Sequence, residues 1–170
     1  QLLRKRRYER GGIDFDFPET KIILDAQGHV TDIHPYERNE AHMLIEDFML
    51  AANETVAEDF FWQQVPFVFR VHEKPDAEKF QQLSLAIENF GHFIRIRDDE
   101  SIRPKEVQKL LDAIVGPPEE PIIKTMTLRS LKQARYSTEC SGHFGLAAKY
   151  YCHFTSPIRR YPDLQIHRIV

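Results

Sequence analysis

The sequence predicts an α+β domain in which antiparallel strands near the amino terminus are followed by several helices. Three observations support this class. Apolar and polar side chains alternate over residues 13–17, which is the period of a strand. Residues 21–25 and 29–34 lie on either side of a turn at Gly28, a pattern typical of a hairpin. Apolar residues with helical spacing then recur through most of the remaining chain.

The first half of the chain should contain two helices besides the hairpin. A basic helical segment over residues 1–10 ends at Gly11-Gly12, because glycine frees the backbone for a sharp turn. Asn39 is a favourable N-cap for a long helix that extends to about Phe60. We expect its core-facing stripe to be Leu44, Ile45, Phe48, Ala52, Thr55 and Val56.

The second half is expected to be mainly scaffold. Residues 61–72 are rich in aromatic side chains and valine, which favours a strand. Helices are predicted over 77–90, 104–115 and 121–135, with a charged loop over 97–104. Because the sequence contains no repeat and no low-complexity linker, we expect these segments to belong to one domain.

Composition restricts the possible functions. The 170 residues are 42% hydrophobic and 29% charged, with a net charge of −3, so bulk electrostatics cannot drive the binding of a polyanion. Contacts to RNA would have to come from two local basic patches, which are Arg4, Lys5, Arg6, Arg7 and Arg10 at the start, and Arg159, Arg160 and Arg168 at the end. With two cysteines, no signal peptide and no membrane-length apolar run, a cytoplasmic protein is expected.

A short stretch near the end has the features of an anion-binding corner. Ser156 and Pro157 suit an N-cap followed by the first helical position. Backbone N–H groups at Ile158 and Arg159 would then point outward toward a phosphate, with the guanidinium groups of Arg159 and Arg160 beside them. Pro162 should start a second helix. The alternative is an ordinary capped helix whose arginines form surface ion pairs.

The run His153-Phe-Thr-Ser-Pro-Ile-Arg-Arg-Tyr-Pro-Asp-Leu164, followed by His167 and Arg168, resembles the signature of the ribonuclease II / ribonuclease R family, closer to its ribonuclease R branch. The resemblance implies a parent that is a processive, Mg2+-dependent 3′ to 5′ exoribonuclease, which degrades single-stranded RNA to nucleoside 5′-monophosphates. Residues 1–170 would be the carboxy-terminal part of one RNB catalytic domain. The upstream aspartate cluster and the flanking cold-shock and S1 modules would lie outside this chain, which we expect to be an excised fragment.

The resemblance also implies roles for individual residues. Arg159 would be catalytic, stabilising charge that develops on the phosphate. Phe15 would stack on bases at the RNA 3′ end, or else belong to the core. Glu46 would accept a hydrogen bond from a ribose 2′-hydroxyl, or else be a surface or ion-pair residue.

Further RNA contacts are expected around the corner. The resemblance implies them for Ser156, Arg160 and Tyr161. His143 lies in a second family-like motif, Gly142 to Ala147, where it would either donate to a phosphate or fill the core.

No metal site is expected within this chain. Asp14 and Asp16 alternate as on the wet face of a strand, although carboxylates also suit Mg2+. Cys140, His143, Cys152 and His153 are possible zinc ligands with poor spacing. The Mg2+ ligands of the parent would lie in the upstream aspartate motif, so this fragment alone should not hydrolyse RNA. Two other functions stay open, a catalytically dead RNA-binding relative and a protein-interaction scaffold.

Overall fold

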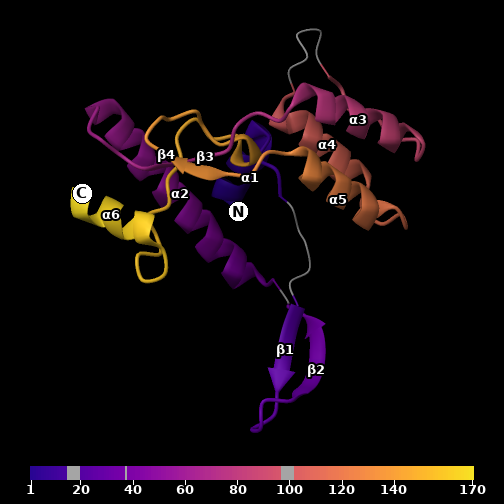
Figure 1. Ribbon diagram of the computed structural model, residues 1–170, viewed down its shortest axis with the longest axis horizontal. Helices are drawn as coiled ribbons and strands as arrows, with labels where there is room; N and C mark the ends of the chain where they lie inside the picture. Colours follow the sequence, from indigo (N-terminus) through magenta and orange to yellow (C-terminus); the bar gives the residue numbers. More distant parts are fainter. Residues whose placement is uncertain (15–19, 37, 97–101) are drawn as a thin grey trace.

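The computed structural model describes residues 1–14, 20–36, 38–96 and 102–170. These residues form helices and two small antiparallel sheets, so the predicted α+β class is confirmed (Figure 1). The elements in chain order are α1 (Leu2–Arg10), β1 (Thr20–Leu24), β2 (Val30–Pro35), α2 (Glu40–Gln63), β3 (Phe69–Val71), α3 (Ala77–Glu88), α4 (Pro104–Ala113), α5 (Glu120–Ser130), β4 (Arg135–Ser137), η1 (Phe144–Leu146) and α6 (Tyr161–Ile169). None of the helices traced in these ranges has the length and apolar character needed to cross a bilayer.

The predicted hairpin is present and extends away from the helical body (Figure 1). β1 pairs antiparallel with β2, with Ile22 opposite Ile33, and Gly28 takes a left-handed φ of 87° at the turn. The expected strand over 13–17 is not found in its described part. Ile13 and Asp14 lie outside any strand, and Ile13 is buried in the core. The rest of that segment, including Phe15, lies outside the described residues.

The long helix α2 begins where the sequence predicts but presents a different face to the body. Asn39 caps it, and its side chain accepts from the His42 N–H at 3.0 Å. The predicted core stripe is wrong for four of its six residues: Leu44, Ile45 and Phe48 are 49–59% exposed, and Thr55 is exposed too. Ala52 is half-buried, and Val56 packs against a hydrophobic cluster as predicted. The buried side chains are instead Asp47, Asn53 and Ala57. The polar side of α2 faces inward because basic side chains of α1 and the backbone of residues 152–154 meet it there.

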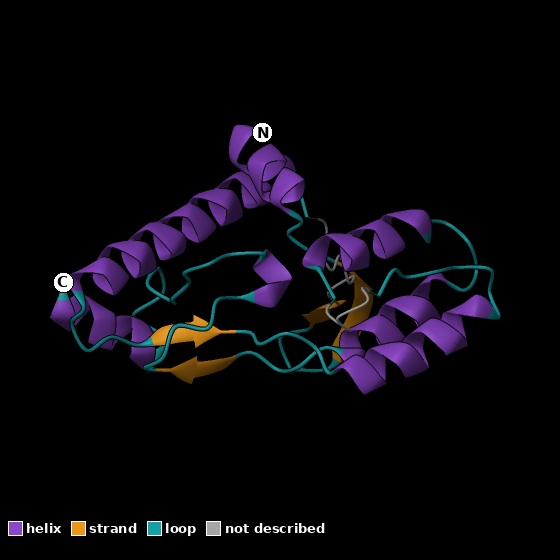
Figure 2. Ribbon diagram, turned by 90° about the horizontal axis from the view of Figure 1, so that it is seen from above, coloured by secondary structure: helices purple, strands orange, loops and turns teal. Residues whose placement is uncertain are grey.

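One hydrophobic cluster holds α3, α4 and α5 together, and these helices lie in one group on the right of Figure 2. Phe80 and Ile87 of α3, Val107 of α4 and Ile123 of α5 are fully buried. The third of these helices is shorter than predicted and ends at Ser130. Residues 135–137 form β4 instead of continuing the helix.

A second cluster lies where β3, the end of α2 and α6 meet, and it contains Phe67, Phe69, Val71, Cys152 and Ile166. The predicted strand over 61–72 is reduced to residues 69–71, because α2 continues to Gln63. β3 pairs antiparallel with β4. This small sheet and α2 support the carboxy-terminal corner.

Candidate nucleic-acid interface

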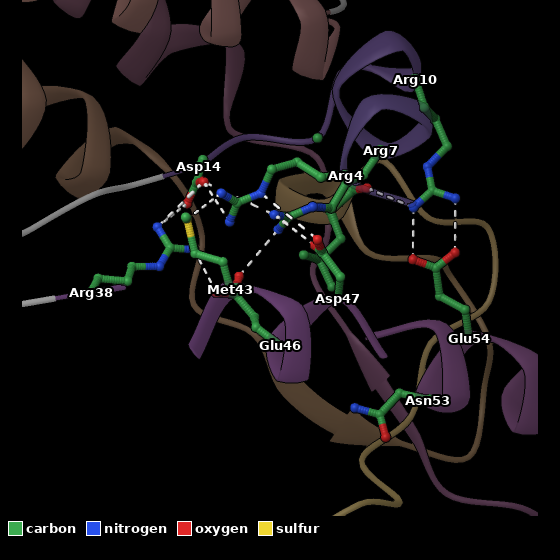
Figure 3. A network of polar contacts seen from close by, with 12 residues as sticks. Arg4, Arg7, Arg10, Asp14, Arg38, Met43, Glu46, Asp47, Asn53 and Glu54 are labelled. Atoms are coloured by element: carbon green, nitrogen blue, oxygen red, sulfur yellow. Dashed lines mark hydrogen bonds and ion pairs between the residues drawn. The ribbon is translucent and has the colours of Figure 1, made fainter. Parts of the chain in front are cut away.

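Ion pairs join α1 to α2 (Figure 3). Arg10 donates to both carboxylate oxygens of Glu54 at 2.8 and 2.7 Å. Arg7 and Arg4 approach the buried carboxylate of Asp47 at 3.5 and 3.9 Å. α1 buries no side chain of its own, so these contacts anchor it. The amino-terminal basic patch is therefore largely neutralised within the protein rather than presented to a ligand.

Glu46 belongs to the same network. Its carboxylate accepts from Arg38 and lies 3.5 Å from Arg7, while Arg38 and Arg7 also reach Asp14 at 3.4 and 3.9 Å. The hydrogen bond from Arg38 to Glu46 is the main reason that the pKa of Arg38 is raised. A ribose hydroxyl would have to share Glu46 with these guanidinium groups, so its role in binding ribose remains a prediction.

Asn53 connects α2 to the carboxy-terminal corner. Its side chain is 2% exposed, donates to the Tyr151 hydroxyl at 3.2 Å and accepts from the Phe154 N–H at 2.9 Å. The Cys152 thiol donates to the Asn53 carbonyl at 3.2 Å. Because Asn53 follows Glu46 by seven residues, both lie on the same side of α2, about 10 Å apart along its axis. Sequence reasoning missed Asn53, although an asparagine inside a long helix is itself a signal.

The corner is organised by Asp163, which is fully buried. One of its carboxylate oxygens accepts from the Ser156 N–H at 2.8 Å and from Nε and Nη2 of Arg160 at 3.1 and 2.8 Å. Arg160 is therefore turned inward as the partner of a buried acid. Its predicted contact with RNA is untested, but its guanidinium group already has a structural role.

The backbone of the corner differs from the predicted helix start. Residues 157–159 form a turn, in which the N–H groups of Arg159 and Arg160 donate to the Ser156 carbonyl at 3.3 and 3.1 Å. The N–H of Arg159 therefore does not point outward toward a phosphate as expected. The second helix is confirmed: α6 begins at Tyr161, with Pro162 in its first turn.

Arg159 and Tyr161 remain at the surface of the corner. Arg159 is exposed, and its guanidinium group donates to the Ser156 hydroxyl at 3.5 Å. Within the described residues, no carboxylate lies within ion-pair distance of Arg159. Tyr161 is 63% exposed and accepts from Gln165. Arg159 is thus the arginine of this corner whose charge is available to a ligand.

A row of rings connects the corner to the Gly142 to Ala147 motif. The His143 and Tyr151 rings lie 5.1 Å apart, and the Tyr151 and His153 rings 5.8 Å apart. Tyr136 bonds to His153 at 2.8 Å, and Arg70 stacks over Tyr136 at 4.8 Å. The sequence analysis did not single out Arg70, which alternates with the buried Phe69 and Val71 and so points to the other face of β3.

Both histidines of this row are electrically neutral at neutral pH. Burial, then the positive charge of neighbouring groups, lowers the pKa of His143 to about 3, and burial, then Arg160, lowers that of His153 to about 4. Nδ1 of His143 accepts from the Leu146 N–H at 3.3 Å, which leaves the ring proton on Nε2. His143 can therefore donate one hydrogen bond to a phosphate but brings no charge.

The described residues do not offer a metal site. No group of three or more His, Cys, Asp or Glu side chains among them is placed to hold an ion. Cys152 donates to Asn53 and Cys140 to the Lys149 carbonyl, so the zinc alternative has no support. Asp14 is surrounded by arginines, and Asp16 lies outside the described residues. The residues present do not fit a resident Mg2+.

The sequence and the fold of this chain are similar to those of known ribonucleases and of one pseudonuclease. A ribonuclease R from Aquifex aeolicus (strain VF5) is 45% identical over 170 residues, which cover all of this chain and 24% of that protein. The structure of Mycoplasma genitalium RNase R in complex with ribose methylated single-stranded RNA matches with a TM-score of 0.92 at 32% identity, over 99% of this chain and 26% of that one. Yeast Ssd1, a pseudonuclease, matches with a TM-score of 0.66 at 26% identity, over 78% of this chain and 16% of that one.

The chain thus spans about a quarter of the length of the ribonuclease R proteins that it matches. The RNB domain family matches residues 1–170, the whole of the sequence. The signature at residues 153–168, the fold and the corner built on Asp163 all lie within this match. The chain therefore belongs to the RNB domain family.

Proposed function

We propose that the parent protein is a 3′ to 5′ exoribonuclease that hydrolyses single-stranded RNA to nucleoside 5′-monophosphates. Residues 1–170 would be the carboxy-terminal part of its RNB catalytic domain and would supply the side of the site that holds the phosphate. The observation that carries the proposal is the exposed Arg159, which has no ion-pair partner among the described residues, on a corner fixed by the buried Asp163. The identity to ribonuclease R proteins over the whole chain supports it.

Arg159 is suited to stabilise charge that develops on the scissile phosphate. A guanidinium group offers several donors in a fixed plane, and donors that are already in position need no reorganisation during the reaction. Ser156, Tyr161 and the Nε2–H of His143 would orient the same phosphate or its neighbours, while Phe15 and Glu46 would hold the terminal nucleotides. The hydrolytic reaction would use Mg2+, which activates water and neutralises phosphate charge. Its ligands are proposed to lie upstream of this chain, in a cytoplasmic parent.

The main competing function is that of a catalytically dead RNA-binding relative. The similarity to a pseudonuclease favours this candidate, because the fold alone does not ensure activity. The corner would bind RNA in both cases, and only the metal-bearing side would differ. A protein-interaction scaffold would bind no RNA at all.

Replacing Arg159 in the parent enzyme tests the proposal. Arg159→Ala should lower kcat by about 100- to 1000-fold, the usual cost of losing one preorganised donor, while the Kd for RNA changes only a few-fold. Single-turnover hydrolysis with Mg2+ and anisotropy binding in a chelator measure the two quantities. The matched control is Arg129→Ala, which removes an exposed arginine of α5. It should leave both unchanged.

Three results would contradict parts of the proposal. Equal losses in kcat and affinity would show that Arg159 only binds RNA. A wild-type parent that binds RNA without hydrolysing it would be the dead relative, and one that does not bind would be a scaffold. Hydrolysis by the isolated 170-residue chain with Mg2+ would place the metal ligands within it.

A further inference from the structure

A cleft of about 730 Å3 lies between the start of α4, η1 and the loop before η1. Five basic side chains line it, which are Arg10, Lys74, Arg103, Lys105 and Lys149. Within the described part of the chain no acidic residue lines the cleft. This is unexpected for a chain of net charge −3, in which acidic side chains outnumber basic ones.

Four of the five cations are not neutralised inside the protein. Arg10 is paired with Glu54. By contrast, Lys74, Arg103, Lys105 and Lys149 are exposed and have no ion-pair partner among the described residues. The basic patch on α1 shows the opposite behaviour, since its arginines meet the carboxylates of α2. The cleft is therefore a concentrated source of positive potential.

Such an arrangement favours an anionic occupant. Like charges around a concave surface repel one another and raise the local concentration of counter-ions. α4 also begins at this cleft, and its N-cap residue Arg103 provides no side-chain acceptor for the first N–H groups. The positive end of the helix dipole adds to the field of the lysines. Because lysine ammonium groups are point charges on flexible side chains, they suit a series of phosphate groups better than a single ligand of fixed shape.

A row of contacting rings connects the cleft to the candidate site. His143 lines the cleft and contacts Tyr151, whose ring meets His153, and the positive charges of Arg160 and Arg159 act on the pKa of His153. An RNA strand held at the corner by its 3′-terminal phosphates must continue in the 5′ direction, and the row of rings leads from the corner to the cleft.

We propose that this cleft is a second phosphate-binding site, which holds the backbone of the RNA strand on the 5′ side of the nucleotides at the Arg159 corner. The inference rests on the proposed function of the parent and extends it by a separate contact. Its recognition is electrostatic and independent of base sequence. It serves affinity for long strands rather than the hydrolytic step.

The test uses the intact parent protein with a single-stranded RNA of about 20 nucleotides, in a chelator that prevents hydrolysis. The double variant Lys74→Gln/Lys149→Gln removes two cations whose stems are exposed. Because each lysine contact to single-stranded nucleic acid contributes about 0.7 to the slope of log affinity against log salt, the slope should fall by about 1.4. The control Lys21→Gln/Lys79→Gln removes two exposed lysines that do not line the cleft and should leave the slope unchanged.

The outcomes separate this inference from the function on which it rests. If the wild-type parent binds and hydrolyses RNA while the cleft variant keeps the wild-type slope and affinity, the second site is overturned and the proposed function stands. The inference would also be overturned if the cleft variant kept the wild-type affinity for RNA but was no longer inhibited by adenosine 5′-monophosphate. The cleft would then bind the mononucleotide product instead of the RNA strand. If the wild-type parent neither bound nor hydrolysed RNA, the proposed function itself would be wrong.

Discussion

Replacing Asp163 by alanine should destabilise the chain and disorganise the corner that carries Arg159. The carboxylate is fully buried and accepts from the Ser156 N–H and from two nitrogens of Arg160. Its removal leaves the Arg160 guanidinium group, which is only 19% exposed, without its partner. The backbone of the turn also loses the acceptor that fixes Ser156.

The magnitude follows from these contacts. Removing one partner of a buried ion pair costs about 3–5 kcal/mol. The other Asp163 oxygen is buried without a hydrogen-bond partner among the described residues, a desolvation cost that the alanine variant relieves. We therefore expect the lower end, about 3 kcal/mol. Asp163→Asn keeps an oxygen for the Ser156 N–H and should lose less.

Urea denaturation of the 170-residue chain, followed by circular dichroism, measures the loss. For a domain of this size about 3 kcal/mol corresponds to a decrease in Tm of roughly 6–12 °C. Asp59→Ala is the control, because Asp59 is exposed and Gln63 is its one hydrogen-bond donor among the residues that the structure describes. It should remain within about 0.5 kcal/mol of wild type.

The reasoning would be refuted by an alanine variant within about 1 kcal/mol of wild type, or by an asparagine variant that is the less stable of the two. Either result would show that the buried carboxylate does not organise the corner. In the parent enzyme, Asp163→Asn should lower kcat without the loss of fold that alanine causes. A wild-type kcat in the asparagine variant would show that Asp163 does not position Arg159 for the reaction.

Two further predictions concern titration and thiol reactivity. Because burial lowers the pKa of His143 to about 3 and that of His153 to about 4, the unfolded chain binds more protons between about pH 4 and 6.5, so stability should fall as pH is lowered through this range. Urea midpoints measure this, and His153→Gln should flatten the dependence; an unchanged slope would contradict it. Burial raises the pKa of Cys152 to about 12, so a disulfide reagent at pH 8 should modify the partly exposed Cys140 first and Cys152 only on unfolding. Equal rates for the two thiols in the folded chain would refute this.

Local signals were sufficient for the elements that depend on neighbouring residues. The turn at Gly28, the cap at Asn39, the glycine stop after α1 and the break at Pro162 were all predicted correctly, because a cap or a turn is fixed by side chains within a few positions. The signature around Arg159 also identified the family.

Tertiary structure decided which face of each element is buried. Helical spacing in α2 predicted Leu44 and Phe48 as core, yet both are exposed and Asp47 and Asn53 are buried. The cause is that arginines of α1 and the segment around Phe154, both distant in the chain, meet the polar side of the helix.

The same holds for the two arginines of the corner, which residue type alone could not tell apart. The family resemblance implied a catalytic role for Arg159 and an RNA contact for Arg160, but it did not predict which side chain is paired within the protein. The sequence by itself determined the fold class, the family and the place of the corner. Only the tertiary structure showed that Asp163, buried by the packing of α6, takes Arg160 and leaves Arg159 exposed, because burial of a carboxylate requires that a nearby cation compensate its charge.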